Sequence, residues 1–427
     1  MTTTAVLHQV HSIVPPSATL AIDERVRAQR DAGHQIVHLG FGEAGLPVLP
    51  SVADQLSSAA SCNAYGPVAG LPALRAAAAG YFARRGIPTA PEQVIAGPGS
   101  KALLFGLLSV LPGDVVLPRP SWVSYAAQAA LAGKRVLSVP IDRCAGGVPD
   151  PAALREVIAR SRAAGGNPGV LVLTLPDNPT GTLAPGALVA EVVELAVELG
   201  LLIVSDEIYR DLAHDPGAVC SPAAVAPDHA FITNGLSKSM ALGGWRLGFA
   251  RLPDGPLGTG AGRALTGLAS EIWSSPSAPV QHAAAYVLDE PDDVRDHIAR
   301  SRTLHRRVAV AAHARVLAAG ADCRRPAAGF YLYPDLEPLR PALARRRITT
   351  GAQLADRLLA EHDIAVLPGE AFGDDPAALR FRAATSLLYG PDDHHRWSAL
   401  RADQPETLPW IREPLDRLRD ALHALAG

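Results

Sequence analysis

The chain has few cysteines and no hydrophobic run long enough to cross a membrane. Its four cysteines lie far apart and form no Cys-x-x-Cys pair; they are Cys62, Cys144, Cys220 and Cys323. This spacing excludes a disulfide framework and a cysteine-ligated zinc site, and it is typical of cytosolic thiols. No apolar run reaches the roughly 18 residues of a membrane-spanning helix, and the start of the chain lacks the basic and apolar segments of a signal peptide. We therefore expect a cytoplasmic protein.

Strong charge, repeats and low-complexity tracts are also missing. The net charge is −3 and there are no basic runs, which argues against a nucleic-acid partner. Proline and glycine are numerous but dispersed, so no long disordered segment is expected. The 427 residues are 48% hydrophobic, enough for a sizeable core and for two packed domains.

Seven short apolar segments between residues 94 and 250 are predicted to be strands. Several are apolar almost throughout, as strands buried on both faces should be. Helical patterns between most of them predict right-handed βαβ crossovers and a mostly parallel seven-stranded sheet, which places the chain in the α/β class. The predicted strands are Val94–Ala96, Val115–Leu117, Arg135–Val139, Val170–Leu175, Leu201–Ser205, Ala230–Thr233 and Arg246–Ala250.

The chain is predicted to divide into three parts: an N-terminal arm over 1–45, a large domain over 46–300 and a smaller α+β domain over 301–427. The arm contains a predicted helix over 22–32 and is expected to join the small domain. Within the small domain we expect a solvated connection over 339–350, and a polar loop over 389–409 before the last helix, over 411–425.

Lys238 is a lone lysine in a loop of small residues between two apolar strands. An amine that must act as an uncharged nucleophile needs partial burial, because burial lowers its pKa from about 10.4. A solvated loop lysine is the plain alternative, and the neighbouring motifs favour the nucleophile.

Three other stretches have the composition of a ligand site, and each directly follows a predicted strand. They are Pro176–Gly181, Ser205–Tyr209 and Gly97–Ala102. Ligands of open parallel α/β sheets gather at the carboxyl ends of the strands. We therefore expect these stretches and Lys238 to lie close together.

In this order, the motifs resemble those of the class I/II aminotransferases, the fold-type I enzymes that use pyridoxal 5′-phosphate (PLP). The set is Asn178-Pro-Thr-Gly, then Asp206-x-x-Tyr209, then Ser237-Lys238, and the likeness extends from Ser17 to about Leu388. The nearest branch is that of the bacterial aspartate/prephenate aminotransferases. The resemblance implies a large PLP-binding domain, a small C-terminal domain and a homodimer with shared active sites.

The resemblance also implies roles in the chemistry. Lys238 forms the resting internal aldimine and then moves the proton between the substrate α-carbon and the cofactor. Asp206 pairs with the pyridine nitrogen, while Tyr209 and Asn178 donate to the phenolate oxygen. The expected reaction moves an amino group between an L-amino acid and a 2-oxo acid in a ping-pong cycle. Asp206 as a turn cap and Asn178 as a turn former are the structural alternatives.

The cofactor phosphate is expected on the backbone N–H groups of Gly99, Ser100 and Lys101, at the start of a helix predicted over 102–108. Arg246 would add a charge-assisted contact. Many relatives carry a phosphate-binding serine where this chain has Gly235, and Ser237 is left open as its substitute.

Further family positions concern the ring, the substrate and the partner subunit. Trp122 matches the aromatic residue over the pyridine ring, and Gly42 matches a glycine in contact with the substrate. Tyr65 matches the tyrosine that reaches the phosphate of the partner subunit. For the substrate α-carboxylate we prefer Arg380, with Arg382 on the same predicted strand face as the alternative.

The substrate itself does not follow from these motifs. Segments 17–21 and 273–277, with residues of the neighbouring subunit, are expected around the substrate side chain. A PLP-dependent lyase or an oxidative or cyclising enzyme on the same scaffold is the main alternative, and a non-catalytic PLP-binding protein is a remote one.

Three other motifs are set aside. Segment 97–101 lacks the spacing of a phosphate-binding P-loop, and Gly-x-Gly-x-Gly at 258–262 is expected to be a flexible surface loop. The acidic and histidine residues at 392–395 converge poorly on one ion, so no metal is expected.

Overall fold

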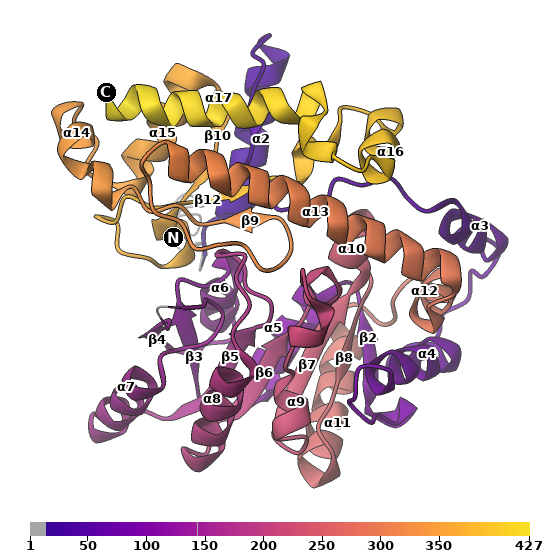
Figure 1. Cartoon of the computed structure of the whole chain (residues 1–427). Helices are drawn as coiled ribbons and strands as arrows, with labels where there is room; N and C mark the ends of the chain where they lie inside the picture. Colours follow the sequence, from indigo (N-terminus) through magenta and orange to yellow (C-terminus); the bar gives the residue numbers. More distant parts are fainter. Residues whose placement is uncertain (1–13, 143) are drawn as a thin grey trace, which may run out of the picture.

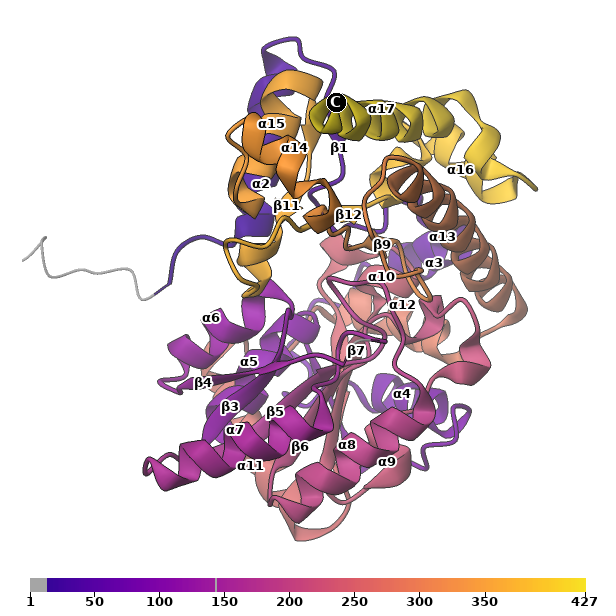
Figure 2. The ribbon, with the colours of Figure 1, turned by 60° about the vertical axis from the view of Figure 1, so that its left-hand side comes forward.

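The computed structural model describes residues 14–142 and 144–427. A seven-stranded sheet with helices on both faces forms the lower part of the molecule in Figure 1, and the C-terminal helices cover its upper end. Figure 2 shows the N-terminal helix α2 (Ala18–Asp31) beside the C-terminal part of the chain.

The large sheet has the strand order β2-β8-β7-β6-β5-β3-β4. All neighbouring pairs are parallel except those of β8, which lies antiparallel to both β2 and β7. All seven predicted strands are present, and the mostly parallel sheet is confirmed. The strands are β2 (Val94–Gly97), β3 (Asp114–Arg119), β4 (Val136–Pro140), β5 (Pro168–Thr174), β6 (Leu202–Asp206), β7 (Ala230–Gly235) and β8 (Gly248–Arg251).

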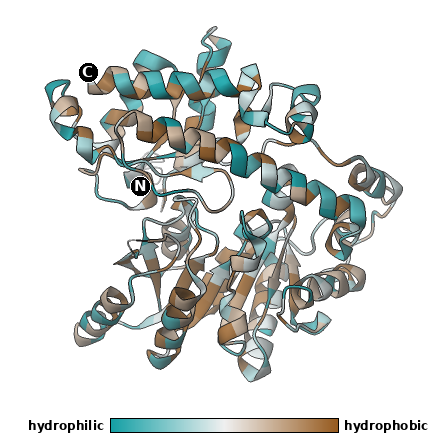
Figure 3. Ribbon diagram, in the orientation of Figure 1, coloured by the Kyte–Doolittle hydropathy of each residue, from teal (hydrophilic) through white to brown (hydrophobic). Residues whose placement is uncertain are grey.

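Side chains of the sheet alternate between two hydrophobic cores, because successive residues of a strand point to opposite faces. Leu171 and Leu173 of β5 pack in one core with α4, α7, α8 and α12, whereas Val170 and Val172 pack in the other with α5, α6 and α11. The central strands are hydrophobic in Figure 3 as a result. The helices are α3 (Pro50–Ser58), α4 (Pro72–Ala83), α5 (Ser100–Val110), α6 (Val123–Leu131), α7 (Pro151–Ala163), α8 (Gly186–Glu198), α9 (Pro222–Val225), α10 (Leu236–Ser239), α11 (Gly255–Ile272) and α12 (Ala278–Asp289).

A third core holds the C-terminal part together. A three-stranded sheet of order β11-β12-β9 packs with α13, α15 and α17, and β1 of the N-terminal arm pairs in parallel with β10. The elements are β1 (Val37–His38), α13 (Asp292–Ala318), β9 (Tyr331–Leu332), α14 (Arg340–Arg345), α15 (Gly351–His362), β10 (Ile364–Ala365), β11 (Leu367–Pro368), β12 (Phe381–Ala384), α16 (Asp393–Arg401) and α17 (Pro409–Ala426).

Helix α13 passes through the expected domain boundary at residue 300. Its first half packs Val294 and Ile298 in a core of the large sheet, and its second half packs Leu304 and Val308 in the C-terminal core. The three-part division remains a proposal, with α13 as the element that the two larger parts share.

Two expected loops are wrong. Residues 258–262 lie inside α11, because their small size lets this helix approach the sheet: a Cβ on Gly262 would lie 2.9 Å from the Leu252 side chain. The arginine-rich segment 339–350 is largely exposed, as expected of a solvated connection, and it contains the short helix α14. The polar segment 389–409 contains α16, whose first turn is capped by the Asp392 carboxylate accepting from the backbone N–H of His395.

Among the described residues, no helix is long and apolar enough to span a membrane. The same residues contain no cluster of three or more potential metal ligands.

Candidate active site

A cavity of about 310 Å³ lies where β5, β6 and β7 end and where the N-terminal arm and the C-terminal sheet meet the large sheet. The motifs found in the sequence meet here, as expected from the position of each after a strand. Its lining includes Ser17, Thr19, Leu20, Gly42, Glu43, Ser100, Lys101, Trp122, Tyr125, Thr174, Asn178, Asp206, Tyr209, Ser237, Lys238, Arg246, Tyr331 and Arg382.

Lys238 lies on the short helix α10 rather than in an irregular loop. Its Nζ donates a hydrogen bond of 2.5 Å to the backbone oxygen of Gly42. Burial, and then the positive charge of Arg382, lowers the pKa of Lys238 to about 8. A substantial fraction of this amine is therefore uncharged near neutral pH, as a nucleophilic lysine requires.

Asp206 ends β6 and points its carboxylate into the cavity. The Tyr125 hydroxyl donates to Oδ2 at 2.9 Å, and the backbone N–H of Ile208 donates to Oδ1 at 3.3 Å. Burial raises the pKa of Asp206 to about 6, although these donors oppose the shift. The Thr233 hydroxyl also donates to Oδ1, at 3.4 Å. A carboxylate has about four acceptor sites, so these three donors leave Asp206 capacity for one more.

Four polar side chains that line the cavity together with Lys238 form two hydrogen-bonded pairs. The hydroxyls of Tyr209 and Tyr331 lie 2.7 Å apart. The Oδ1 of Asn178 accepts a hydrogen bond of 3.2 Å from the Arg382 guanidinium. Asn178 and Tyr209 are each only 4% exposed, so neither is a solvated turn residue.

Arg382, not Arg380, reaches the cavity, which corrects the preference drawn from the sequence. The Arg380 guanidinium is half-buried elsewhere, in ion pairs with Asp335 at 2.7 Å and Asp374 at 3.1 Å. Arg382 is 1% exposed, and besides Asn178 it donates to the backbone oxygen of Gly40 at 2.6 Å. No carboxylate pairs with Arg382 within the described residues, so its charge remains available to a ligand.

An anion cradle forms at the start of α5. Its first backbone N–H groups, those of Ser100 and Lys101, have no partner within the helix. Gly99 has a φ of +88°, and a Cβ there would overlap the Arg246 guanidinium. A Cβ on Gly248 would overlap the backbone of Ser100. Glycine at both positions therefore lets Arg246 and the helix N-terminus approach one anion.

Close packing explains why residue 235 is a glycine. A Cβ there would lie 2.8 Å from the backbone oxygen of Leu247, so a serine would push apart the start of α10 and the adjacent strand. Ser237 lines the cavity two residues later, on the same short helix.

Trp122 and Gly42 both line the cavity. Trp122 caps the start of α6, with its ring edge-on to Tyr125 at 5.2 Å between centroids. The Nζ of Lys101 lies 5.1 Å from the centre of the Trp122 ring. A Cβ on Gly42 would overlap the Tyr331 hydroxyl, so glycine leaves room for that hydroxyl beside Lys238.

Two expected contacts lie outside the cavity of this chain. Tyr65 is 93% exposed and contributes nothing to the cavity lining. Segment 273–277 is absent from the lining too, and Trp273 instead packs against a core of the large sheet. Of segment 17–21, Ser17, Thr19 and Leu20 do line it.

Sequence reasoning missed Tyr331, Tyr125 and Glu43 as cavity residues. Tyr331 lies near Phe330 and Tyr333, and the sequence alone does not say which of these rings faces the site. Tyr125 lies outside the motifs from which the site was predicted. Each enters the site through tertiary packing rather than through a motif.

These groups fit a PLP molecule. The cradle at α5 suits a phosphate, the buried Asp206 suits a protonated ring nitrogen, and the Lys238 amine suits the aldehyde carbon. Arg382 adds a guanidinium fork for a carboxylate.

Comparison with known proteins agrees with this geometry. The sequence model of the family "Aminotransferase class I and II" matches residues 34–386. The aspartate/prephenate aminotransferase of Thermus thermophilus is 34% identical over 84% of this chain and 89% of its own. The aspartate aminotransferase of Geobacillus stearothermophilus is 33% identical over 87% of this chain and 93% of its own.

A solved structure supports the same relationship. Aspartate aminotransferase from T. thermophilus with maleate superimposes with a TM-score of 0.81, at 29% identity, over 99% of both chains. The chain therefore belongs to the class I and II aminotransferases, the PLP-dependent enzymes that transfer an amino group between an amino acid and a 2-oxo acid.

Proposed function

We propose that this aminotransferase uses an acidic amino acid, with L-aspartate in first place, as its amino donor. The observation that carries the proposal is a pair of separate cations in one cavity. Arg382 lies buried at its inner wall, and the accessible Lys101 lies beside Trp122. Two cations match the two carboxylates of a dicarboxylic substrate, and the similar proteins named aspartate and aspartate/prephenate aminotransferases support this choice.

We assign the α-carboxylate of the substrate to Arg382 and its distal carboxylate to the side chain of Lys101. Asn178 holds the Arg382 guanidinium in place. Gly42 contacts the substrate through its backbone, because the Tyr331 hydroxyl takes the space that a side chain would fill. The freed amine of Lys238 takes the proton from the substrate α-carbon, and its pKa of about 8 leaves it partly uncharged for this step.

The cofactor, when bound, supplies a conjugated ring that accepts the electron pair released at the α-carbon. Asp206 keeps the ring nitrogen protonated, Tyr209 and Asn178 donate to the phenolate oxygen, and Trp122 covers the ring face. Gly99, Ser100, Lys101 and Arg246 hold the phosphate, and Ser237 supplies the hydroxyl donor that position 235 lacks.

We further propose a cytoplasmic homodimer in which Tyr65 of each subunit completes the phosphate site of the other. Tyr65 is almost fully exposed in the single chain, and a tyrosine in that state gains a partner only from a second molecule. Four free cysteines are compatible with a reducing compartment.

A competition between donors tests the substrate assignment. We would measure kcat/KM for L-aspartate, L-phenylalanine and L-alanine in the wild type and in Lys101→Gln. The substitution keeps the backbone N–H at the phosphate, so the affinity for PLP should not change and serves as the internal control. We expect kcat/KM for aspartate to fall about 10-fold or more, while the values for the other two donors hold. An equal loss for all three donors would refute the role of Lys101.

A further inference from the structure

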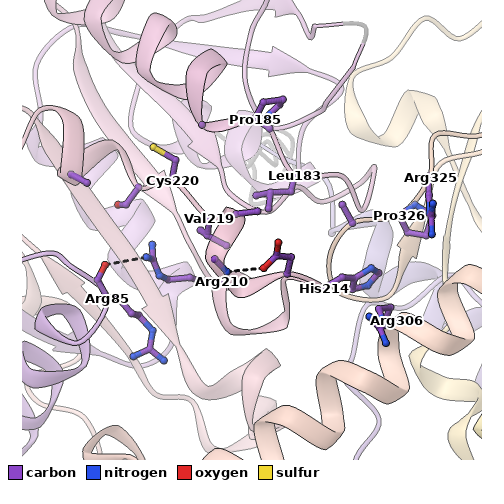
Figure 4. Close-up of a pocket in the computed structure, with 18 of the residues that line it drawn as sticks. Arg85, Leu183, Pro185, Arg210, His214, Val219, Cys220, Arg306, Arg325 and Pro326 are labelled. Carbon is purple, nitrogen blue, oxygen red and sulfur yellow. Dashed lines mark hydrogen bonds between the residues drawn. The ribbon is translucent and has the colours of Figure 1, made fainter.

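A second cavity, of about 990 Å³, lies behind the active site and shares no lining residue with it. Its walls come from the segment before α8, from the short 3₁₀ helices that follow Tyr209, from α13, and from the segment 325–327 (Figure 4). Its size is that of a site for a small organic molecule.

The cavity carries net positive charge. The exposed side chains of Arg306 (α13) and Arg325 both line it, and neither side chain has an ion pair or hydrogen bond in the part of the chain that the structure describes. Figure 4 shows both near His214. Burial lowers the pKa of His214 to about 4, and the charges of Arg306 and Arg325 contribute to this shift.

The other two arginines of the cavity are neutralised. Arg85 pairs with Asp211 at 2.7 Å and with Glu290 at 2.5 Å. Arg210 pairs with Glu207 at 2.7 Å. The Asp215 carboxylate is the acid of the lining, and it accepts from the backbone N–H of Gly217. Asp215 has no ion pair among the described residues, so it offsets one of the two remaining guanidinium charges and the lining keeps a net positive charge for an anionic ligand.

The remaining lining is apolar. It consists largely of aliphatic side chains and prolines, among them Leu183, Pro185, Val219, Val310 and Pro326. A ligand that matches this lining has a charged head for the arginines and a hydrophobic body for the wall, because burial of apolar surface adds about 25 cal/mol per Å².

Three walls of this cavity continue directly into the active site. Leu183 follows the Asn178 motif, Arg210 follows Tyr209, and Pro326 precedes Tyr331. The backbone joins them: Ala327 N–H donates to Gly181 O at 2.8 Å, and His214 N–H donates to Ala327 O at 2.8 Å. A ligand that displaces segment 325–327 therefore acts on the strand that carries Tyr331.

We propose that this cavity is an effector site for a small organic anion with an apolar body, held by Arg306 and Arg325, whose binding changes turnover at Lys238. Coupling of this kind requires the shared segments to have two conformations, and the ligand must bind one of them more tightly than the other. The segments that carry Asn178, Tyr209 and Tyr331 provide the physical connection.

The test uses phenyl phosphate as the probe on the PLP-loaded enzyme, whose own phosphate site is filled. Calorimetric titration should show that each chain binds one molecule of phenyl phosphate in addition to its PLP. Arg306→Gln and Arg325→Gln should each weaken binding about 10-fold or more, since each removes a charge-assisted contact. Arg300→Gln is the matched control: it removes an exposed arginine of the same helix that lies outside the cavity.

The same variants test the coupling. Phenyl phosphate should change kcat/KM of the wild type and of Arg300→Gln, but have no effect on the Arg306→Gln, Arg325→Gln double variant, whose basal activity should be normal. Equal affinity for inorganic phosphate would refute the apolar contribution. Absence of binding, or binding that survives in the double variant, would overturn the site, and binding without a change in turnover would overturn its regulatory role.

Discussion

Arg380 and Arg382 are two residues apart, yet they have different surroundings. Arg380 meets Asp335 and Asp374, which neutralise it, whereas Arg382 is buried beside Asn178 without a carboxylate partner. A buried charge without a counter-ion is costly. At a ligand site this cost is offset when an anionic substrate binds, which explains why the unpaired arginine is the one that faces the cavity.

The two arginines give the first prediction. Arg382→Ala should raise KM for every carboxylate substrate about 10- to 100-fold, because a hydrogen-bonded ion contact contributes about 1.5–3 kcal/mol. Arg380→Ala should leave KM nearly unchanged and lower the melting temperature instead. Steady-state kinetics and thermal unfolding of both variants separate the effects. The reverse pattern would restore Arg380 as the carboxylate ligand.

The second prediction concerns the pKa of Lys238. An amine attacks only when uncharged, and the folded chain lowers its pKa to about 8. The rate at which the cofactor-free protein takes up PLP should therefore rise with pH and level off above about pH 8. An ordinary lysine would give a rate that rises to about pH 10.4.

Arg382→Ala provides the control for this pH profile. Arg382 is the second cause of the lowered pKa of Lys238, so its removal should move the inflection to higher pH. An unchanged inflection would mean that the titration belongs to another group. Lys238→Ala should take up no PLP covalently at any pH, as judged by absorbance after dialysis.

At the scale of elements, the phosphate cradle depends on how α5 starts. Gly99→Ala would place a Cβ against Arg246 in a positive-φ backbone conformation that costs about 1–3 kcal/mol for other residues. We expect the dissociation constant for PLP to rise about 10-fold or more as Arg246 is displaced. Fluorescence titration of the cofactor-free protein measures it.

Gly133→Ala is the matched control for the cradle. Gly133 also has a positive φ, of +70°, but a Cβ there meets nothing within 4 Å. Both variants should lose stability through backbone strain, and only Gly99→Ala should lose affinity for PLP. Equal PLP affinity in the two variants would show that the cradle tolerates the displacement.

For the whole molecule, stability in acid depends on buried histidines along α13. The Nδ1 of His305 lies 2.6 Å from the Tyr389 hydroxyl, and burial lowers the pKa of His305 to about 3. Burial also lowers the pKa of His297, to about 4. The unfolded chain binds these protons near pH 6.5, so between pH 6.5 and 3 it holds more protons than the folded chain. The free energy of unfolding must therefore fall as the pH is lowered through this window.

The fourth prediction is a loss of about 2 kcal/mol from His305 alone between pH 7.5 and pH 5. Urea titrations at both pH values measure the loss. His305→Gln keeps a polar partner for Tyr389 but cannot take up the proton, so the difference between the two pH values should shrink by this amount. A difference that stays the same in His305→Gln would exclude His305 as a source of the acid sensitivity.

The last prediction concerns the assembly. Light scattering should give twice the mass of one chain, and Tyr65→Phe should weaken PLP binding about 10-fold or more through loss of a hydrogen bond to a charged group. A mixed dimer of Tyr65→Phe and Lys238→Ala subunits tests the shared site. Its one site with an intact Lys238 receives an intact Tyr65 from the other subunit, so wild-type affinity should return there. A monomer, or a mixed dimer of weakened affinity, would refute the shared site.

Much of the fold was predictable because the strands of the large sheet are apolar on both faces and short motifs follow them. The seven strands, and the meeting of Asn178, Asp206 and Lys238 at their ends, follow from local pattern and from the topology of parallel sheets. The helical course of 258–262 was missed because glycines suggest a loop, whereas here they admit close packing of α11.

The sequence by itself determined the order of the strands along the chain, the family and the groups that meet around Lys238, because the motifs are local and each directly follows a strand of one mostly parallel sheet. Only the tertiary structure decided between Arg380 and Arg382, brought Tyr331 to Tyr209, and left the side chains of Arg306 and Arg325 without partners among the described residues at a second cavity. These outcomes depend on which distant carboxylates and hydroxyls come within reach, and packing of the C-terminal sheet against the large one decides that.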